Sequence, residues 1–169
     1  MILITGGAYQ GKLEYAKSEF EFGDDDIFDC TIVCATATCA PAAPESSADK
    51  ESSCGCRNVE LRRDEAARRA VKEAWIDGDA KVLSHFERYV LACVDAGIDA
   101  RKYLSVNIES FRDKIIIADD ITQGVVPIDA RERAWREETG KCLVFLGKKA
   151  ERVIRVFCGI ARDIKDVEK

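Results

Sequence analysis

The first dozen residues of the chain predict a site that binds phosphate groups. After a short apolar run, Gly6, Gly7, Gly11 and Lys12 fall in the frame Gly-x-x-x-x-Gly-Lys. This is the spacing of a phosphate-binding loop, whose backbone N–H groups surround an anion with no Cβ atom in the way. The lysine adds a positive charge, and the N-terminus of the next helix points to the same place. The predicted nucleotide-binding residues are Gly6, Gly7, Ala8, Tyr9, Gln10, Gly11, Lys12 and Leu13.

The residue after the lysine departs from this pattern. A serine or threonine at that position would place a hydroxyl group on Mg²⁺, whereas this chain has Leu13. The phosphate-binding frame is therefore present and one metal ligand is missing. The alternative interpretation is a glycine-rich turn between a strand and a helix that binds nothing.

Asp119 and Asp120 form a second candidate site, because they end the apolar run 113–119. A continuous apolar run is typical of a central parallel strand, and α/β sheets bind ligands at the carboxyl ends of such strands. Carboxylates there hold Mg²⁺ directly or through water, or orient a substrate hydroxyl. The alternative role for both residues is in a turn or a helix cap.

His85 is the only histidine of the chain. It could act as a base near neutral pH or accept a phosphoryl or nucleotidyl group covalently, or it could be a half-buried residue on a helix face. Arg133 and Arg136 lie near the start of a predicted helix and are candidates for binding phosphate groups of a substrate. The alternative for both arginines is a solvated helix surface.

Five of the eight cysteines gather in one region of the sequence: Cys30, Cys34, Cys39, Cys54 and Cys56. Four thiolates could form a zinc site, but the usual pairs of Cys-x-x-Cys are absent, so unbound thiols are the favoured interpretation. The segment 40–57 between and around them is rich in small and charged residues and is predicted to be a loop or a disordered insert.

Alternating strands and helices must position these residues. Strands are expected near residues 1–5, 28–35, 113–119 and 152–159, with one more possible near residue 82. Helices are expected near residues 13–22, 59–75, 85–96 and 130–146, followed by a short charged tail from residue 162. This order predicts one α/β domain over residues 1–169, with a mainly parallel sheet and helices on both faces.

Composition limits the classes of function. With 169 residues, 47% hydrophobic and 34% charged, the chain has the make-up of a soluble globular domain. Its net charge of −5 argues against nucleic acid as the main partner. No apolar run reaches membrane-spanning length and no signal segment is visible, so we expect a cytoplasmic protein with no membrane contact. Assembly into a homo-oligomer stays open.

Three stretches of the chain, the loop at residues 6–12, residues 119–127 and residues 133–140, resemble motifs of the adenosylcobinamide kinase/adenosylcobinamide-phosphate guanylyltransferase family. Chains of that family open with a strand and a Gly-Gly-Ala-x-x-Gly-Lys loop. They later carry Asn-Glu-Val-Gly-x-Gly-Val-Val-Pro, where residues 119–127 read Asp-Asp-Ile-Thr-Gln-Gly-Val-Val-Pro. Their Arg-x-x-Arg-x-x-x-Gly helix is matched by Arg133, Arg136 and Gly140. The likeness covers roughly the first twenty and the last fifty-five residues.

The resemblance implies a P-loop NTPase-like fold and a role in cobalamin biosynthesis. The first implied step transfers the γ-phosphoryl group of ATP or GTP to a hydroxyl of adenosylcobinamide. The second transfers GMP from GTP to that phosphate through a nucleotidylated histidine. The resemblance implies Lys12 and Asp120 as catalytic residues, and Arg133 or Arg136 on the nucleotide or the corrinoid substrate. His85 as a further catalytic candidate, and Asp119 beside Asp120 on Mg²⁺, come from the residue types alone.

Three departures from the family pattern shape this prediction. Leu13 replaces the metal-binding hydroxyl residue, the segment 40–57 has no histidine where the family carries one, and the family's Asp-Cys-Leu-Thr strand is absent. We therefore expect the kinase step rather than guanylyl transfer. The alternatives are a non-catalytic nucleotide- or corrinoid-binding protein, and a metal-binding module built on the cysteines.

Overall fold

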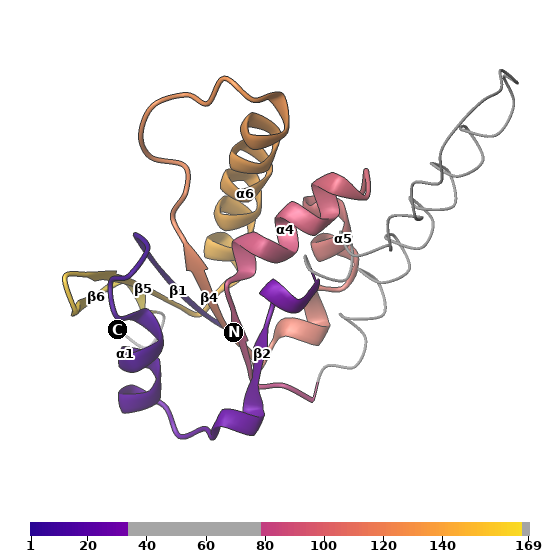
Figure 1. Ribbon diagram of the computed structural model, residues 1–169. Coiled ribbons are helices and arrows are strands. Elements are labelled where there is room, and N and C mark those ends of the chain that lie inside the picture. The colour runs from indigo at the N-terminus through magenta and orange to yellow at the C-terminus, as the bar shows by residue number, and fades with distance from the viewer. Residues whose placement is uncertain (34–78, 167–169) are drawn as a thin grey trace, which may run out of the picture.

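The apolar runs of the sequence become strands of one sheet in the computed structural model, which describes residues 1–33 and 79–166 (Figure 1). The strands are β1 (Ile2–Gly6), β2 (Ile27–Asp29), β3 (Val82–Ser84), β4 (Ile115–Asp119), β5 (Arg152–Phe157) and β6 (Ile160–Asp166). Their order in the sheet is β2-β3-β4-β1-β5-β6. All neighbours pair in parallel except β5 and β6, which are antiparallel. The predicted α/β class and mainly parallel sheet are confirmed.

Helices cover both faces of this sheet. They are α1 (Lys12–Glu19), α4 (Phe86–Asp95), α5 (Ala100–Val106) and α6 (Ala130–Lys149), with short 3₁₀ helices at Asp24–Asp26 and Ile108–Phe111. Side chains alternate along each strand. Leu3 and Ile116 therefore join a core cluster with α4, α5 and α6 on one face. Ile4 and Ile117 join a second cluster with Ala16 of α1 on the other face.

The second strand is shorter than the sequence predicted. The β-branched run favoured a strand over residues 28–35, but β2 ends at Asp29 and residues 31–33 are helical. The reason is local, because the Asp29 side chain accepts a hydrogen bond from the backbone N–H of Thr31 at 2.9 Å. An aspartate that binds the backbone two residues later closes a turn and competes with strand pairing.

The last strand is one half of a hairpin. The sequence favoured one strand over 152–159 and a charged tail, whereas residues 160–166 form β6 against β5. Cys158 and Gly159 both have positive φ, 49° and 76°. Positive φ at both residues of a two-residue loop is the geometry that joins antiparallel strands without splaying them.

Some predictions concern residues that the structure does not describe. The insert at 40–57, the helix at 59–75 and the cysteines 34, 39, 54 and 56 fall outside residues 1–33 and 79–166. Within those two ranges, no helix combines the length and the apolar character that crossing a membrane requires.

Candidate functional site

The residues that the sequence singled out meet at one edge of the sheet. The loop with Lys12 follows β1, Asp119 ends β4 and His85 follows β3. Because these strands are parallel, their carboxyl ends lie at the same edge. The helix after β1 and the helix after β4 cover opposite faces. In open α/β sheets, ligands bind in the crevice between two such neighbouring strands.

Glycine is required where β1 ends and the loop begins. A Cβ atom on Gly6 would lie 2.2 Å from the carbonyl oxygen of Val156 in β5, so no side chain fits. The carbonyl oxygen of Gly6 accepts a hydrogen bond from the backbone N–H of Asp120 at 2.7 Å. At the other end of the loop, Gly11 has φ 79° and precedes the first residue of α1. The two glycines thus allow the loop to pass closely between β4 and β5 and to enter the helix.

The β5–β6 turn supports the loop through Gln10. The backbone N–H of Gly159 donates to the Gln10 carbonyl oxygen at 3.2 Å. The backbone N–H of Cys158 donates to the Gln10 side-chain oxygen. Tyr9, beside it, is fully exposed with φ 59°. The hairpin that the sequence did not predict is therefore the structure that holds the middle of the loop.

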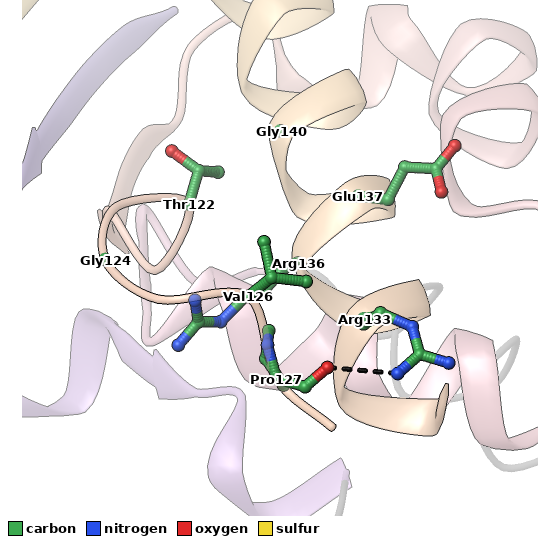
Figure 2. Close-up of a pocket in the computed structure, with 8 residues that line it drawn as sticks. All are labelled: Thr122, Gly124, Val126, Pro127, Arg133, Arg136, Glu137 and Gly140. Carbon is green, nitrogen blue, oxygen red and sulfur yellow. Dashed lines mark hydrogen bonds between the residues drawn. The ribbon is translucent and has the colours of Figure 1, made fainter. Parts of the chain in front are cut away.

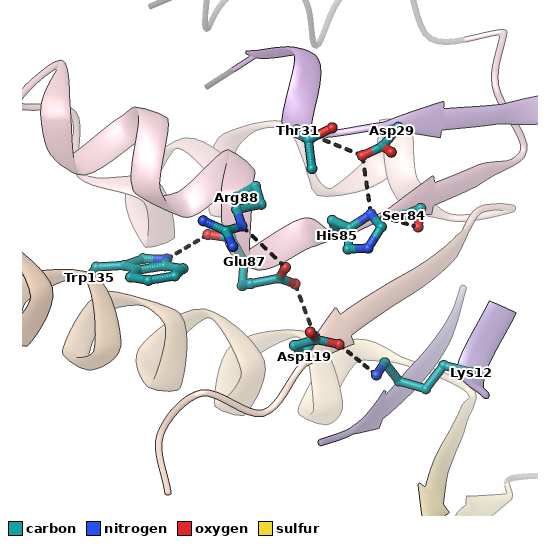
Figure 3. Close-up of polar contacts among 9 residues, drawn as sticks. All are labelled: Lys12, Asp29, Thr31, Ser84, His85, Glu87, Arg88, Asp119 and Trp135. Atoms are coloured by element: carbon teal, nitrogen blue, oxygen red, sulfur yellow. Dashed lines mark hydrogen bonds and ion pairs between the residues drawn. The ribbon is translucent and has the colours of Figure 1, made fainter. Parts of the chain in front are cut away.

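Lys12 folds back into its own loop. Its side chain is 7% exposed, which is low for a lysine. Its Nζ donates to the carbonyl oxygen of Gly7 at 2.6 Å and pairs with Asp119 Oδ1 at 2.5 Å (Figure 3). A buried ammonium group is stable only when paired and hydrogen-bonded. The charge predicted for phosphate binding is thus held at the crevice between β1 and β4.

Glu87, in the first turn of α4, is a residue of this site that sequence analysis missed. It is 2% exposed, and its Oε2 accepts the backbone N–H of Asp119 at 2.9 Å. Burial raises the pKa of this carboxyl, and the nearby negative charge of Asp119 adds to the shift. Trp135 Nε1 donates to the backbone carbonyl of Glu87 at 2.6 Å, which ties α6 to this turn.

A signal for Glu87 was present in the sequence. Residues 87, 90, 91 and 94 fall on one helical face, and the last three are Val90, Leu91 and Val94. An acidic residue within an apolar stripe departs from the usual segregation of charged side chains to the solvent face. It indicates a carboxyl group that is buried for a reason other than packing.

His85 lies between β3 and α4 in a backbone conformation that is uncommon outside glycine. Its φ and ψ are 53° and 47°, in the left-handed region. Its Nδ1 lies 3.1 Å from Asp29 Oδ1 and 3.2 Å from Ser84 Oγ. Burial alone would raise the pKa of Asp29, but hydrogen bonds from Thr31 and the nearby imidazole lower it overall. Asp29 is a second residue of the site that sequence analysis did not identify.

Asp120 takes part in the turn that follows β4. Its Oδ1 accepts the hydroxyl of Thr122 at 2.6 Å and the backbone N–H of Thr122 at 3.2 Å. Asp119, not Asp120, therefore pairs with Lys12. The structure brings the two predicted metal candidates to the same sheet edge but gives them different partners.

Arg133 and Arg136 bind the loop between β4 and α6. Nη1 of Arg133 donates to the carbonyl oxygens of Pro127 and Ile128, the first at 3.0 Å. Nη1 of Arg136 donates to the carbonyl oxygen of Val125 at 2.8 Å. These bonds order a loop that carries little regular structure of its own. Part of each guanidinium is thus engaged by the protein itself.

A pocket lies between this loop and α6 (Figure 2). Its volume is about 380 Å³. It is lined by Thr122, Gly124, Val126, Pro127, Arg133, Arg136, Glu137 and Gly140. The neighbouring side chains of Val125 and Ile128 are 88% and 97% exposed. The arrangement offers an apolar wall and two guanidinium groups to a ligand.

Metal binding at this edge would depend on Asp119 and Asp120. Leu13 cannot contribute, because its side chain packs against the apolar cluster beneath α1. No group of three or more histidine, cysteine or acidic residues suited to a metal occurs in the part of the chain that the structure describes. Mg²⁺ nevertheless commonly takes only one or two carboxylates, with phosphate oxygens and water completing its shell. Asp119 Oδ1 already faces a cation, the ammonium of Lys12. Asp119 and Asp120 therefore fit a site in which the protein supplies only one or two carboxylates to Mg²⁺.

No protein-family model matches the sequence, and no curated protein is significantly similar to it.

Proposed function

We propose that this protein is a nucleotide-dependent phosphotransferase whose acceptor is a hydroxyl group of a corrinoid, as its resemblance to adenosylcobinamide kinases implies. The observation that carries the proposal is the position of Lys12. It is a nearly buried lysine inside a glycine-rich loop, at the carboxyl edge of a parallel sheet, paired with a carboxylate of the neighbouring strand. This is the place where α/β proteins bind phosphate groups.

Phosphate binding would redirect Lys12. Its ammonium now bonds to Gly7 and Asp119, and both partners lie within reach of the loop where the phosphates would bind. Backbone N–H groups of residues 7–12 and the N-terminus of α1 would surround the phosphate oxygens. Phosphoryl transfer depends mainly on positioning and on charges that stabilise the transition state. Lys12 would supply that charge at the transferred group.

Asp119 and Asp120 are the residues that would hold Mg²⁺ beside the nucleotide. The ion would neutralise negative charge on the phosphate groups. Glu87 would keep Asp119 in place, because its carboxylate binds the Asp119 backbone N–H.

The acceptor would bind against the pocket between α6 and residues 122–128. That loop continues directly from Asp119 and Asp120, so an acceptor in the pocket approaches the same sheet edge. The exposed Val125 and Ile128 provide apolar contact for a large substrate. Arg133 and Arg136 would shape the loop and present the rest of their guanidinium N–H groups to polar groups of the acceptor.

A non-catalytic nucleotide- or corrinoid-binding protein is the second candidate function. The observation that favours it is the packing of Leu13 into the core beneath α1, which leaves the loop without the hydroxyl ligand for Mg²⁺. Such a protein would bind nucleotide through Lys12 without transferring phosphate.

A transfer assay separates the two candidates. Purified protein is mixed with adenosylcobinamide and ATP or GTP labelled in the γ-phosphate, with Mg²⁺ present, and labelled corrinoid is quantified. We expect labelled product from the wild type, and at least a hundredfold less from Lys12→Ala, about the loss seen when one stabilising donor is removed. Lys17→Ala is the matched control, since Lys17 lies on α1 but pairs with Asp24 at the surface.

The outcomes are distinct. No product from the wild type, together with retained binding of nucleotide, would favour the non-catalytic candidate. Equal product from the wild type and Lys12→Ala would contradict the proposed site.

A further inference from the structure

Asp29 and His85 form a dyad, a hydrogen-bonded pair, at the carboxyl edge of the sheet, and the proposed nucleotide site uses neither residue. Asp29 ends β2 and His85 follows β3, and these two strands pair in parallel. Their side chains meet at 3.1 Å between Oδ1 of Asp29 and Nδ1 of His85 (Figure 3). Asp29 is itself fixed, because the same Oδ1 accepts the backbone N–H of Thr31. The carboxylate therefore cannot turn away from the imidazole without breaking the turn after β2.

The hydrogen bond determines which ring nitrogen of His85 is free. An ionised carboxylate only accepts hydrogen bonds, so the contact with Asp29 favours a proton on Nδ1, and the hydroxyl oxygen of Ser84 at 3.2 Å then acts as a second acceptor. Nε2 then holds the lone pair. The imidazole is 46% exposed, so this nitrogen is open to a ligand. A carboxylate that fixes the tautomer of a histidine in this way also stabilises the imidazolium once it forms.

The left-handed backbone of His85 indicates that a histidine side chain is required at this position. A left-handed conformation is strained for a residue with a Cβ atom, and such strain persists where the surrounding structure imposes it. β3 ends at Ser84 and α4 begins at Phe86, so His85 alone makes the connection. Glycine would adopt this conformation without strain, and the chain has histidine instead.

The position of His85 in the sheet suits a residue that contacts the acceptor of a phosphoryl group. β3 is two strands away from β1 in the sheet, a lateral separation of roughly 10 Å, and in register it ends level with Ile4, two residues before the end of β1. In Figure 3 the imidazole lies on the side of Asp29 that faces Glu87, Asp119 and Lys12. An acceptor hydroxyl between the imidazole and the terminal phosphate would fit this separation.

We propose that the Asp29–His85 dyad is the general base that removes the proton of the acceptor hydroxyl, with His85 catalytic and Asp29 positioning it; this rests on the proposed phosphotransferase function. The acceptor oxygen forms a bond to the γ-phosphorus as its proton passes to Nε2. The bond between the γ-phosphorus and the bridging oxygen breaks, and the nucleoside diphosphate leaves with that electron pair. The imidazolium, stabilised by Asp29, then releases the proton to water.

Other charged groups surround the imidazole and enter the design of the test. They are Glu87 and Arg88 on its own helix and, beyond Glu87, the Lys12–Asp119 pair (Figure 3). All of them are unchanged when Asp29 is replaced. Asp29→Asn keeps an oxygen for the Thr31 backbone N–H and removes only the charge that faces the histidine. His85→Asn keeps a residue that tolerates left-handed φ and removes the base.

The kinetic test compares these two variants with Asp25→Asn, an exposed aspartate of the turn before β2. We expect His85→Asn to lower kcat for phosphoryl transfer at least a hundredfold, with nucleotide Kd unchanged, in line with the usual contribution of a general base. We expect Asp29→Asn to lower kcat less than His85→Asn does, because the imidazole keeps Nε2 and loses only the carboxylate that orients the ring. Asp25→Asn should match the wild type.

A spectroscopic test does not depend on turnover. His85 is the only histidine, so the ¹⁵N chemical shifts of labelled histidine report one ring. We expect the neutral ring to be protonated at Nδ1 in the wild type and that preference to weaken in Asp29→Asn. A ring protonated mainly at Nε2 would overturn the proposal.

Two further outcomes would also overturn it: wild-type kcat in His85→Asn, or a covalent phosphoryl or nucleotidyl adduct on His85 in the mass spectrum during turnover. These differ from failure of the proposed function, which is the absence of transfer by the wild type; in that case the base role falls with it.

Discussion

At the scale of single residues, the buried carboxyl of Glu87 connects the fold to the site. It satisfies the backbone N–H of Asp119, the residue that pairs with Lys12. A buried donor left without its acceptor costs about 1–3 kcal/mol, more than the roughly 0.5–1.5 kcal/mol that a hydrogen bond contributes when made. The orientation of Asp119 therefore depends on a side chain from a different element.

Replacing Glu87 tests this connection. Glu87→Gln keeps an acceptor oxygen at the same position, and burial already raises the pKa of the native carboxyl, so a neutral side chain suits the site. We expect its free energy of unfolding to stay within about 1 kcal/mol of the wild type. Glu87→Ala leaves the Asp119 N–H unpaired and should lose about 1–3 kcal/mol or more.

Urea unfolding monitored by circular dichroism measures both variants. Equal stability of Glu87→Ala and Glu87→Gln would show that the hydrogen bond to Asp119 contributes nothing, and would contradict this account of how Asp119 is held.

At the residue scale, sequence analysis located the glycine-rich loop and Asp119 but missed two other polar residues of the site. Lys12 and Asp119 were predicted because glycine spacing and an apolar strand ending in acids are local patterns. Asp29 and Glu87 were missed because their roles depend on contacts between strands and helices distant in the chain. The left-handed backbone of His85 also follows from the tertiary structure, since no local rule requires a strand to enter a helix through one residue.

At the scale of elements, the close approach of β1 to β5 is the feature that shapes the loop. Gly6 ends β1 directly against the backbone of Val156, and the β5–β6 turn binds Gln10 four residues later. Strands β4, β1 and β5 together therefore fix where the glycine-rich loop begins.

Gly6→Ala should disturb this junction. Its Cβ atom would lie 2.2 Å from a backbone oxygen, so the strands must separate. We expect a loss of about 1–3 kcal/mol or more in unfolding free energy, the usual range for overpacking. Gly7→Ala is the matched control, because its nearest contact would be an ordinary 3.5 Å to the Gln10 side chain. Thermal unfolding of both variants decides the point, and an equal Tm for the two would contradict the described approach of β1 and β5.

Element boundaries were harder to predict than the elements themselves. β1 and β4 were predicted because each is an apolar run buried on both faces. β6 was missed because its residues are largely exposed and charged, as an edge strand allows. β2 was predicted too long because the turn made by Asp29 ends it despite the β-branched residues that follow.

At the scale of the whole molecule, strand order explains why the residues of the candidate site lie at one edge of the sheet. The chain leaves β1 for the far edge at β2, returns through β3 and β4, and crosses β1 to reach β5. The helices after β1 and β4 therefore lie on opposite faces. Lys12, Asp29, His85 and Asp119 each lie at or just after the carboxyl end of one of these parallel strands. The resemblance implied a phosphate site at the end of β1, and the topology adds the crevice beside it.

Calorimetric titration of ATP and GTP, with and without Mg²⁺, tests the central claim most directly. The wild type should bind at least one of the two nucleotides, and Lys17→Ala should bind it with the same Kd. Lys12→Ala should bind about ten- to a hundredfold more weakly, because it loses a charge-assisted hydrogen bond to the phosphate groups, worth about 1.5–3 kcal/mol. Absence of binding by the wild type, or equal affinity in Lys12→Ala, would contradict a nucleotide site at Gly6–Lys12.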